Sequence, residues 1–284
     1  MQKTQNQPKW ERNQHLVLLG CGKMVSALLE GWLHQKENFK RISIIEPAGI
    51  SAELEALDLI TCYVSLEQLI AQDTAPIDFV VLAVKPQMML DAIAPFSKIT
   101  DENIVFLSIA AGLSYRWLRE HLNGTKQIVR AMPNTPAEIG VGVTAKIANN
   151  NVSKNAIERA EKLLSAIGEV VSLNSEGQMD AVTGLSGSGP AYVFYLIDAL
   201  AAAGHKQGLE KELAMKLAKM TVLGGAKLAA EPSAVPEVLR VNVTSPNGTT
   251  EAGLKILMNS ENGLGPLIEK TVAAATARSE DLAN

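Results

Sequence analysis

Residues 15–25 read HLVLLGCGKMV, and this stretch decides the fold. Residues 15–20 have the apolar character of a buried strand, and residues 24–35 have the pattern of a helix. Between them lies the glycine-rich turn Gly20-Cys-Gly22. A turn of this kind between a strand and a helix is typical of the first unit of a doubly wound α/β domain.

The same alternation continues through the first half of the chain. Strands are predicted at residues 41–46, 59–63, 77–84, 103–108, 126–130, 141–148 and 170–173. Helical patterns lie between them, at residues 65–71, 114–121 and 154–167. Strands that alternate with helices predict a parallel sheet with crossover connections.

The pattern changes near residue 174. Clear strand patterns stop, and helical runs follow at residues 177–184, 189–206, 210–230, 249–259 and 261–281. Asn174-Ser175 is well suited to cap the first of these helices. We therefore expect an α/β Rossmann-like domain over residues 14–174 and an all-α dimerisation domain over residues 175–284. Residues 1–13 are polar and are expected to form a flexible tail.

One of the predicted helices is apolar almost all round. Residues 189–204 read GPAYVFYLIDALAAAG. A helix that is apolar on every side must be buried on every side. Either it is the central core helix of its own domain, or a second subunit covers it, and we expect at least a homodimer.

Composition excludes several classes of protein. The chain has 284 residues and a formal net charge of −4, and no run of Lys or Arg suits nucleic acid or an anionic membrane. No stretch is apolar and long enough to span a bilayer. Two cysteines, Cys21 and Cys62, make no disulfide framework and favour a reducing cytoplasm. The four histidines are scattered without zinc-like spacing, so no metal is expected.

The glycine-rich turn has the features of a dinucleotide site. Gly20 permits the tight turn, and Gly22 lets the backbone approach a pyrophosphate at the start of the helix. Val25 stands where the fingerprint has Gly or Ala, and its larger side chain would push helix and strand slightly apart. The expected cofactor contacts here are Gly20, Cys21, Gly22, Lys23, Met24 and Val25. The alternative is a plain glycine turn.

Two further strand ends suit a cofactor. Glu46 ends the second strand, where an acidic residue typically binds the ribose 2′-hydroxyl of NAD and repels a 2′-phosphate. No Arg or Lys follows it closely, which favours NADH; the alternative is a solvated carboxylate. Lys85, before Pro86, ends the most apolar strand and could meet a phosphate or ribose, although such a lysine is more often only a surface residue.

Later segments resemble one family in particular. They are IVRAMPNTPA at 128–137, DAVTGLSGSGPAYVF at 180–194, TVLGGAK at 221–227 and VTSPNGTTEAGL at 243–254. Together with GCGKM at 20–24 and VKP at 84–86, they resemble the signature of the pyrroline-5-carboxylate reductases. The resemblance runs in order from about residue 14 to residue 282.

The resemblance implies an activity, an assembly and cofactor contacts. The activity is reduction of 1-pyrroline-5-carboxylate to L-proline by NADPH or NADH, the last step of proline biosynthesis. The assembly is a homodimer with interlocked helical domains, or a larger ring of dimers. Further implied cofactor contacts are Ala83, Val84, Lys85, Pro86, Ala110 and Asn242.

The resemblance also implies a substrate loop. The family core Ser-Pro-Gly-Gly-Thr-Thr appears here as residues 245–250, with Asn247 in place of the first glycine. Asn is the best non-glycine residue if that position needs a positive φ. A helix starting at Thr249-Thr250 would present free N–H groups and hydroxyls to a carboxylate. The implied substrate contacts are Ser245, Asn247, Gly248, Thr249 and Thr250; the alternative is a helix start without a ligand.

The resemblance places the Thr250 hydroxyl near the ring nitrogen of the substrate, so Thr250 is the expected catalytic residue. A hydroxyl at that nitrogen would suffice, which agrees with the absence of an evident catalytic histidine. Ser186 and Ser188 are expected near substrate or cofactor, and the alternative is a turn between helices. Two other functions stay open. A β-hydroxyacid dehydrogenase would use a lysine such as Lys216 or Lys219 as acid and base, but residues 245–250 are foreign to that class. A dinucleotide-sensing regulator would show no turnover.

Overall fold

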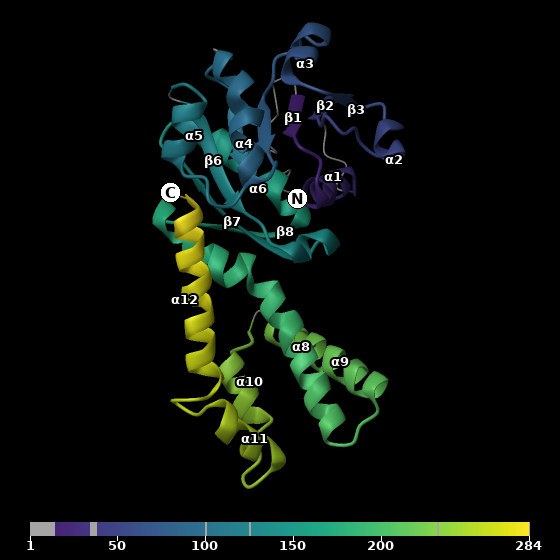
Figure 1. Cartoon of the computed structure of the whole chain (residues 1–284), viewed down its shortest axis with the longest axis vertical. Coiled ribbons are helices and arrows are strands. Elements are labelled where there is room, and N and C mark those ends of the chain that lie inside the picture. Colours follow the sequence, from purple (N-terminus) through teal and green to yellow (C-terminus); the bar gives the residue numbers. More distant parts are fainter. Residues whose placement is uncertain (1–14, 35–38, 100, 125, 232, 284) are drawn as a thin grey trace, which may run out of the picture. The chain divides into compact units, whose positions relative to one another are not determined.

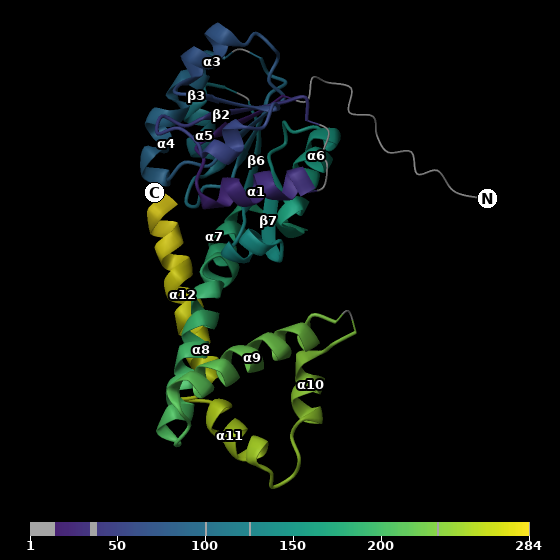
Figure 2. The same cartoon turned by 90° about the vertical axis from the view of Figure 1, so that its right-hand side faces the viewer.

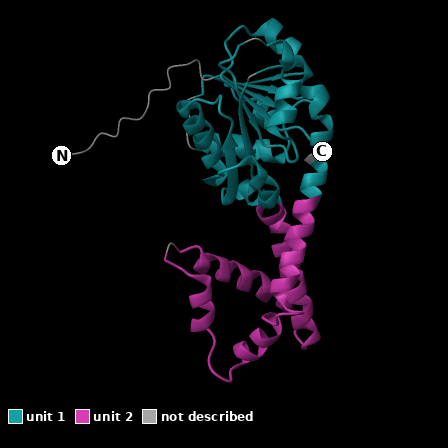
Figure 3. Ribbon diagram, turned by 90° about the vertical axis from the view of Figure 1, so that its left-hand side faces the viewer, with its two compact units in different colours: residues 1–183, 278–284 teal, residues 184–277 magenta. Residues whose placement is uncertain are grey.

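The computed structural model describes residues 15–34, 39–99, 101–124, 126–231 and 233–283 (Figure 1). The chain forms two compact units (Figure 3). The first lies within residues 1–183 and 278–284, and the second is residues 184–277.

The first unit is built on one sheet of eight described strands in the order β3-β2-β1-β4-β5-β6-β7-β8. The strands are β1 (His15–Leu19), β2 (Arg41–Ile45), β3 (Ile60–Tyr63), β4 (Phe79–Leu82), β5 (Val105–Ser108), β6 (Gln127–Met132), β7 (Gly142–Ala148) and β8 (Gly168–Ser172). The order reverses beside β1, as in a Rossmann-like sheet. The predicted strand regions and fold class are therefore confirmed.

One strand pair departs from the predicted parallel sheet. β6 and β7 pair antiparallel, whereas the other neighbouring strands pair parallel. The link between them is only residues 133–141, with the short 3₁₀ helix η2 (Thr135–Ile139). A parallel return needs a crossover of about a dozen residues or more, so this link is too short for one.

Two apolar layers cover the two faces of the sheet, and β1 contributes to both. Leu16 and Leu18 belong to one layer, whereas Val17 and Leu19 belong to the other, as the period of two in a strand requires. Helices α1 (Lys23–His34) and α6 (Lys154–Leu164) pack in the first layer, and α3 (Leu66–Gln72), α4 (Pro86–Ile93) and α5 (Tyr115–His121) in the second. This burial on both faces explains why the strands are almost continuously apolar.

The boundary between the units depends on which property defines it. The strand pattern of the sequence ends near residue 174, after β8. By packing, the first unit extends to Thr183 through α7 (Met179–Val182), and it also includes the end of α12 (Leu264–Ala283). The Ser279 hydroxyl donates a 2.7 Å hydrogen bond to the Asp180 carboxylate. Contacts distant in sequence thus add helical residues to the sheet unit.

The second unit is helical. It contains α8 (Gly189–Lys206), α9 (Lys211–Ala229), α10 (Pro236–Asn242), α11 (Thr249–Leu257) and most of α12 (Figure 2). α10 was not among the predicted helices, because prolines surround this segment in the sequence. Pro236 stands in the first turn of α10, where proline is tolerated because its missing N–H would have no helical partner.

The apolar helix α8 is not the buried core of its own chain. Phe194 and Tyr195 are 60% and 75% exposed, and Ala201 is the one buried residue that the structure describes on this helix. α9 carries exposed apolar side chains as well, Met220 among them. The alternative of an ordinary central core helix is therefore wrong for the single chain. Apolar surface of this extent marks a contact with another molecule.

Gly31 provides a stability test of the first unit. It lies within α1, where alanine normally stabilises a helix by about 0.5–1 kcal/mol. Here an added Cβ would lie 2.5 Å from the Ala166 backbone oxygen and 2.9 Å from the Ala166 Cβ. We expect Gly31→Ala to lower the free energy of unfolding by about 1–3 kcal/mol, measured by urea denaturation.

Glu30→Ala is the matched control, because Glu30 directly precedes Gly31 on α1 and its side chain is exposed. It should change the free energy of unfolding by about 0.5 kcal/mol or less. Stabilisation by Gly31→Ala would show that α1 does not pack this closely on residue 166.

Candidate dinucleotide site and substrate loop

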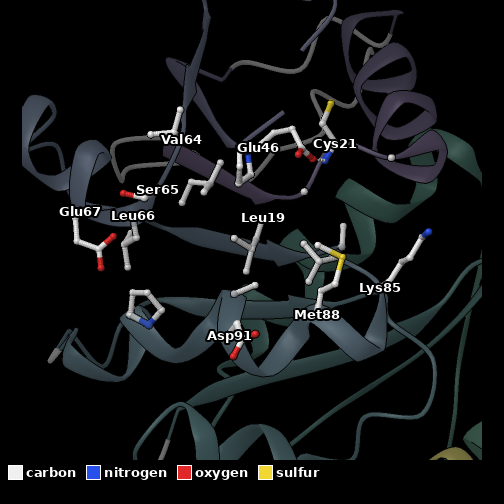
Figure 4. A pocket seen from close by; sticks show the side chains of 18 residues that line it. Leu19, Cys21, Glu46, Val64, Ser65, Leu66, Glu67, Lys85, Met88 and Asp91 are labelled. Carbon is white, nitrogen blue, oxygen red and sulfur yellow. Dashed lines mark hydrogen bonds between the residues drawn. The ribbon is translucent and has the colours of Figure 1, made fainter. Parts of the chain in front are cut away.

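A cavity of about 440 Å³ lies at the carboxyl ends of β1, β2, β3 and β4 (Figure 4). Leu19 and Ile45 are the last residues of β1 and β2, and Val64 and Ala83 directly follow β3 and β4. Ligands of open α/β sheets bind beyond this edge. The fold therefore places the cavity where a dinucleotide is expected.

The glycine-rich turn forms one wall of the cavity. Gly20 has φ +93°, and its N–H donates a 3.0 Å hydrogen bond to the Ile45 carbonyl. A Cβ here would lie 2.9 Å from Val84 Cγ1, so the turn needs glycine for its conformation and for its close approach to Val84. A Cβ on Gly22 would meet nothing within 4 Å. Open space beside Gly22, at the start of α1, fits a pyrophosphate.

Glu46 is held by the turn rather than left in solvent. Its carboxylate accepts hydrogen bonds from the N–H of Cys21 at 3.0 Å and from the N–H of Ala48 at 3.3 Å. The side chain is half-buried and lines the cavity. Two fixed donors orient the carboxylate, which makes it a positioned acceptor for ribose hydroxyls.

Both cysteines are free thiols near Glu46. Burial raises the pKa of Cys21, and the Glu46 carboxylate raises it further. Burial likewise raises the pKa of Cys62, whose thiol lies 3.9 Å from the Glu46 carbonyl oxygen. These shifts favour the protonated thiols, which are weak nucleophiles.

The predicted cofactor residues fall into two groups. The lining of the cavity includes Gly20, Cys21, Gly22, Glu46, Ala83, Val84 and Lys85. The predicted residues outside this lining are Lys23, Met24, Val25, Pro86, Ala110 and Asn242.

The predicted cofactor residues outside the cavity lining lie in different parts of the two units. Val25 is 1% exposed in the apolar layer under α1, and Met24 packs against the same layer. Ala110, just after β5, packs against the opposite layer. Asn242 is exposed at the end of α10, in the second unit. For these residues a cofactor contact stays a prediction.

Sequence reasoning missed part of the cavity wall. Residues 64–67 follow β3, and Met88, Asp91, Ala92 and Pro95 come from α4 and the 3₁₀ helix η1 (Ala94–Lys98). Residues 64–67 directly follow a predicted strand, so the rule that places ligands at strand ends would have found them. No local pattern marks Asp91, which enters the wall only because α4 packs beside the strand ends.

The predicted substrate loop, in the second unit, contains a tight β-turn. Gly248 N–H donates a 3.0 Å hydrogen bond to the Ser245 carbonyl, which closes the turn around Pro246 and Asn247. Asn247 has φ +59°, the left-handed conformation that a type II turn requires at this position. The expectation that Asn247 replaces glycine at a positive φ is confirmed.

Helix α11 begins directly after this turn, at Thr249. Gly248 is its N-cap and gives it no side-chain cap. The first N–H groups of a helix have no partner inside the helix, and they carry partial positive charge. Exposed Thr249 and Thr250 add two hydroxyls to this helix start. The arrangement can receive a small anion such as a carboxylate.

One carboxylate of the protein already contacts this loop. Asn247 N–H donates a 2.6 Å hydrogen bond to Glu251 Oε2, from the first turn of α11. This hydrogen bond joins the turn to the first turn of α11. It leaves the helix start itself as the place for an external anion.

Ser186 and Ser188 lie near the start of α8. Ser186 belongs to a π-helical turn, Thr183–Gly187, and Ser188 is the N-cap of α8 without a side-chain cap bond. Both are half-buried. π-turns are frequent at functional sites, so the geometry is compatible with the predicted contacts.

The described residues contain no group of three or more His, Cys, Asp and Glu side chains that could hold a metal ion. Among the same residues, no helix is long and apolar enough to cross a membrane. His15 is buried at the start of the sheet, with its ring 2.8 Å from the Ser43 hydroxyl, and burial lowers the pKa of His15. This histidine therefore has a structural role.

Two family models match the chain. Residues 176–282 match the pyrroline-5-carboxylate reductase dimerisation family, and residues 15–112 match the NADP oxidoreductase, coenzyme F420-dependent family. The first match falls on the helical part of the chain, and the second on most of the parallel sheet. The predicted order, an α/β region followed by a helical dimerisation region, agrees with both.

Known proteins resemble the chain over nearly its whole length. Pyrroline-5-carboxylate reductase of Pseudomonas aeruginosa is 40% identical, over 94% of this chain and 96% of that protein. Pyrroline-5-carboxylate reductase of Haemophilus influenzae is 35% identical, over 94% of this chain and 97% of that protein. A solved structure of the reductase from Coxiella burnetii has a TM-score of 0.86 at 31% identity, over 96% and 99%.

The solved Plasmodium falciparum pyrroline carboxylate reductase, with NADP bound, has a TM-score of 0.78 at 28% identity, over 95% of this chain and 98% of that one. Agreement in sequence, in fold and in the dimerisation model has one explanation. The chain belongs to the pyrroline-5-carboxylate reductase family.

Proposed function

We propose that this protein reduces 1-pyrroline-5-carboxylate to L-proline with NADPH or NADH, the last step of proline biosynthesis. The observation that carries the proposal is the turn at residues 245–248, in which left-handed Asn247 leads into the uncapped start of α11. Asn247 supplies a positive φ at a position where the family pattern has glycine. Membership in the reductase family supports the same function.

The nucleotide part of the site is assigned to the cavity of the first unit. The amides at the start of α1, beside Gly22, would receive the pyrophosphate, and Glu46 would accept hydrogen bonds from the ribose. Ala83, Val84 and Lys85 form the wall where β4 ends. When bound, the nicotinamide cofactor supplies the hydride.

The substrate part is assigned to the start of α11. Its free amides, with Ser245 and Thr249, would hold the substrate carboxylate, and Ser186 and Ser188 are further proposed contacts. The Thr250 hydroxyl would donate a hydrogen bond to the ring nitrogen. This hydrogen bond strengthens as the imine accepts the hydride at carbon and electron density moves to nitrogen. A neutral hydroxyl suffices because the imine is fairly basic and takes a proton from solvent before hydride transfer, so that hydride addition gives a neutral amine whose new lone pair accepts this hydrogen bond.

A direct assay tests the proposal. Purified protein should oxidise NADH or NADPH when 1-pyrroline-5-carboxylate is added, and L-proline should appear in equal amount. Turnover with a β-hydroxyacid but not with the imine would indicate a dehydrogenase that uses Lys216 or Lys219. Cofactor binding without turnover on either substrate would indicate a regulator.

Assembly and compartment complete the proposal. The family model for dimerisation supports a homo-oligomer, and we propose a homodimer or a ring of dimers. The exposed apolar residues of α8 and α9 would be buried between subunits. The two free cysteines favour the reducing cytoplasm as the compartment.

Light scattering should therefore give at least twice the 30.4 kDa mass of the chain. Burial of side chains such as Phe194 between subunits supplies the hydrophobic free energy for association. The measurement is made at micromolar concentration across a dilution series. A clean monomer throughout would contradict the proposed assembly.

Glu46→Ser should raise the use of NADPH relative to NADH by about tenfold. The substitution removes one negative charge and frees the N–H groups of Cys21 and Ala48 for a 2′-phosphate. The measurement is kcat/KM with each nucleotide. Glu158→Gln, an exposed carboxylate on α6, serves as the control. An unchanged ratio would mean that Glu46 does not contact the ribose.

Thr250→Val should lower kcat and kcat/KM by about 10–100-fold, less than the ~10²–10³-fold typical of a lost oxyanion donor. Water can partly replace the hydroxyl. Valine keeps the volume, so the loss reports the hydrogen bond rather than packing. Affinity for the nucleotide should barely change.

Thr61→Val makes the same replacement at an exposed position of β3 and should leave kcat almost unaltered. Full kcat in Thr250→Val, or a loss confined to nucleotide binding, would show that Thr250 only starts the helix.

A further inference from the structure

The wall of the cavity around Glu46 offers hydrogen-bond acceptors, because its backbone donors are already used. The N–H groups of Cys21 and Ala48 donate to the Glu46 carboxylate, and Gly49 N–H donates to the Glu46 carbonyl at 2.9 Å. Val64 N–H, on the neighbouring strand end after β3, donates to the Gln68 side chain at 2.7 Å. A phosphate needs donors, whereas a ribose hydroxyl needs an acceptor.

Helix α3, which begins at this wall, is also closed to an anion. The hydroxyl oxygen of its N-cap Ser65 accepts a 3.2 Å hydrogen bond from Gln68 N–H. Glu67 occupies the first turn and lines the cavity. Hydrogen bonds from its own N–H and from the Ser65 hydroxyl hold the pKa of Glu67 below its usual value, so its side chain is a carboxylate at neutral pH.

A third carboxylate comes from α4. Figure 4 shows Asp91 on the wall formed by α4, with Glu67 and Glu46 on other sides of the same cavity. Lys85 is the one cationic side chain among the lining residues that the structure describes, and Figure 4 shows its amino group directed away from the three carboxylates. The charged side chains that line the cavity therefore carry a net negative charge.

We propose that Glu67 and Asp91 act together with Glu46 as specificity residues that select NADH over NADPH. The inference rests on the nucleotide site of the proposed function. The two nucleotides differ by one phosphate on the adenosine ribose, which adds negative charge and only acceptor oxygens. Glu46 excludes this phosphate by direct contact, and Glu67 and Asp91 oppose it through space.

The three carboxylates contribute unequally, because only Glu46 occupies the donors that a phosphate would use. Removing Glu46 frees two N–H groups, but it leaves two negative charges in the cavity. Glu46→Ser alone should therefore improve NADPH binding without making NADPH the preferred nucleotide. Each further neutralisation should lower the dissociation constant for NADPH by about three- to tenfold, which is the size of one partly screened charge interaction.

The test is a direct titration of the unliganded enzyme, followed by the fluorescence of NADH or NADPH and needing no substrate. The variants are Glu46→Ser, its combinations with Glu67→Gln and with Asp91→Asn, and the triple variant. Glu158→Gln, outside the cavity, is the control. We expect the dissociation constant for NADPH to fall with each substitution, and to fall by smaller factors at high salt. The dissociation constant for NADH should change less than about twofold with each substitution at positions 67 and 91.

The outcomes separate this inference from the function on which it rests. The enzyme could bind both nucleotides, with a ratio of the two dissociation constants that Glu67→Gln and Asp91→Asn change no more than the control does. This result would overturn the role of these two residues but not the nucleotide site. Equal loss of NADH and NADPH in the same variants would also overturn it, because the residues would then only shape the cavity. A wild-type enzyme that binds neither nucleotide would overturn the nucleotide site itself.

Discussion

The close approach of Gly20 to the end of β4 is the constraint on which the site depends. The Gly20 N–H is fixed by the Ile45 carbonyl, and its Cα faces Val84 so closely that no Cβ fits. β1 can therefore turn directly into α1, whose first amides border the cavity at the strand ends. The same turn supplies the Cys21 N–H that orients Glu46. One glycine thus connects the fold, the space for the nucleotide and the position of the proposed ribose contact.

The two units carry sites of opposite electrostatic character. In the first unit, carboxylates gather around the cavity, and the backbone donors beside Glu46 are used by the protein itself. In the second unit, the turn at residues 245–248 leaves the start of α11 uncapped, so donors stay available. Acceptors suit ribose hydroxyls and donors suit a carboxylate. This division matches the two molecules that a pyrroline-5-carboxylate reductase must distinguish.

The second unit depends on association more than the first. The first unit buries its strands between two apolar layers, whereas α8 and α9 expose large apolar side chains in the single chain. For helices of this kind, stability and assembly are linked, because the partner supplies the missing half of the core. The end of α12, from Arg278, also packs with the first unit, where Ser279 is buried and its hydroxyl donates to Asp180.

The sequence by itself determined the strands, most helices, the glycine turn and the left-handed Asn247, because each depends on residues that are neighbours in the chain. Glu46 was also found this way, from its place at a strand end. The tertiary structure alone decided the antiparallel pairing of β7, the donors that hold Glu46, the entry of Asp91 into the cavity wall and the exposure of α8. These features join residues far apart in sequence. Their contacts depend on how whole elements pack, which no local period of apolar residues encodes.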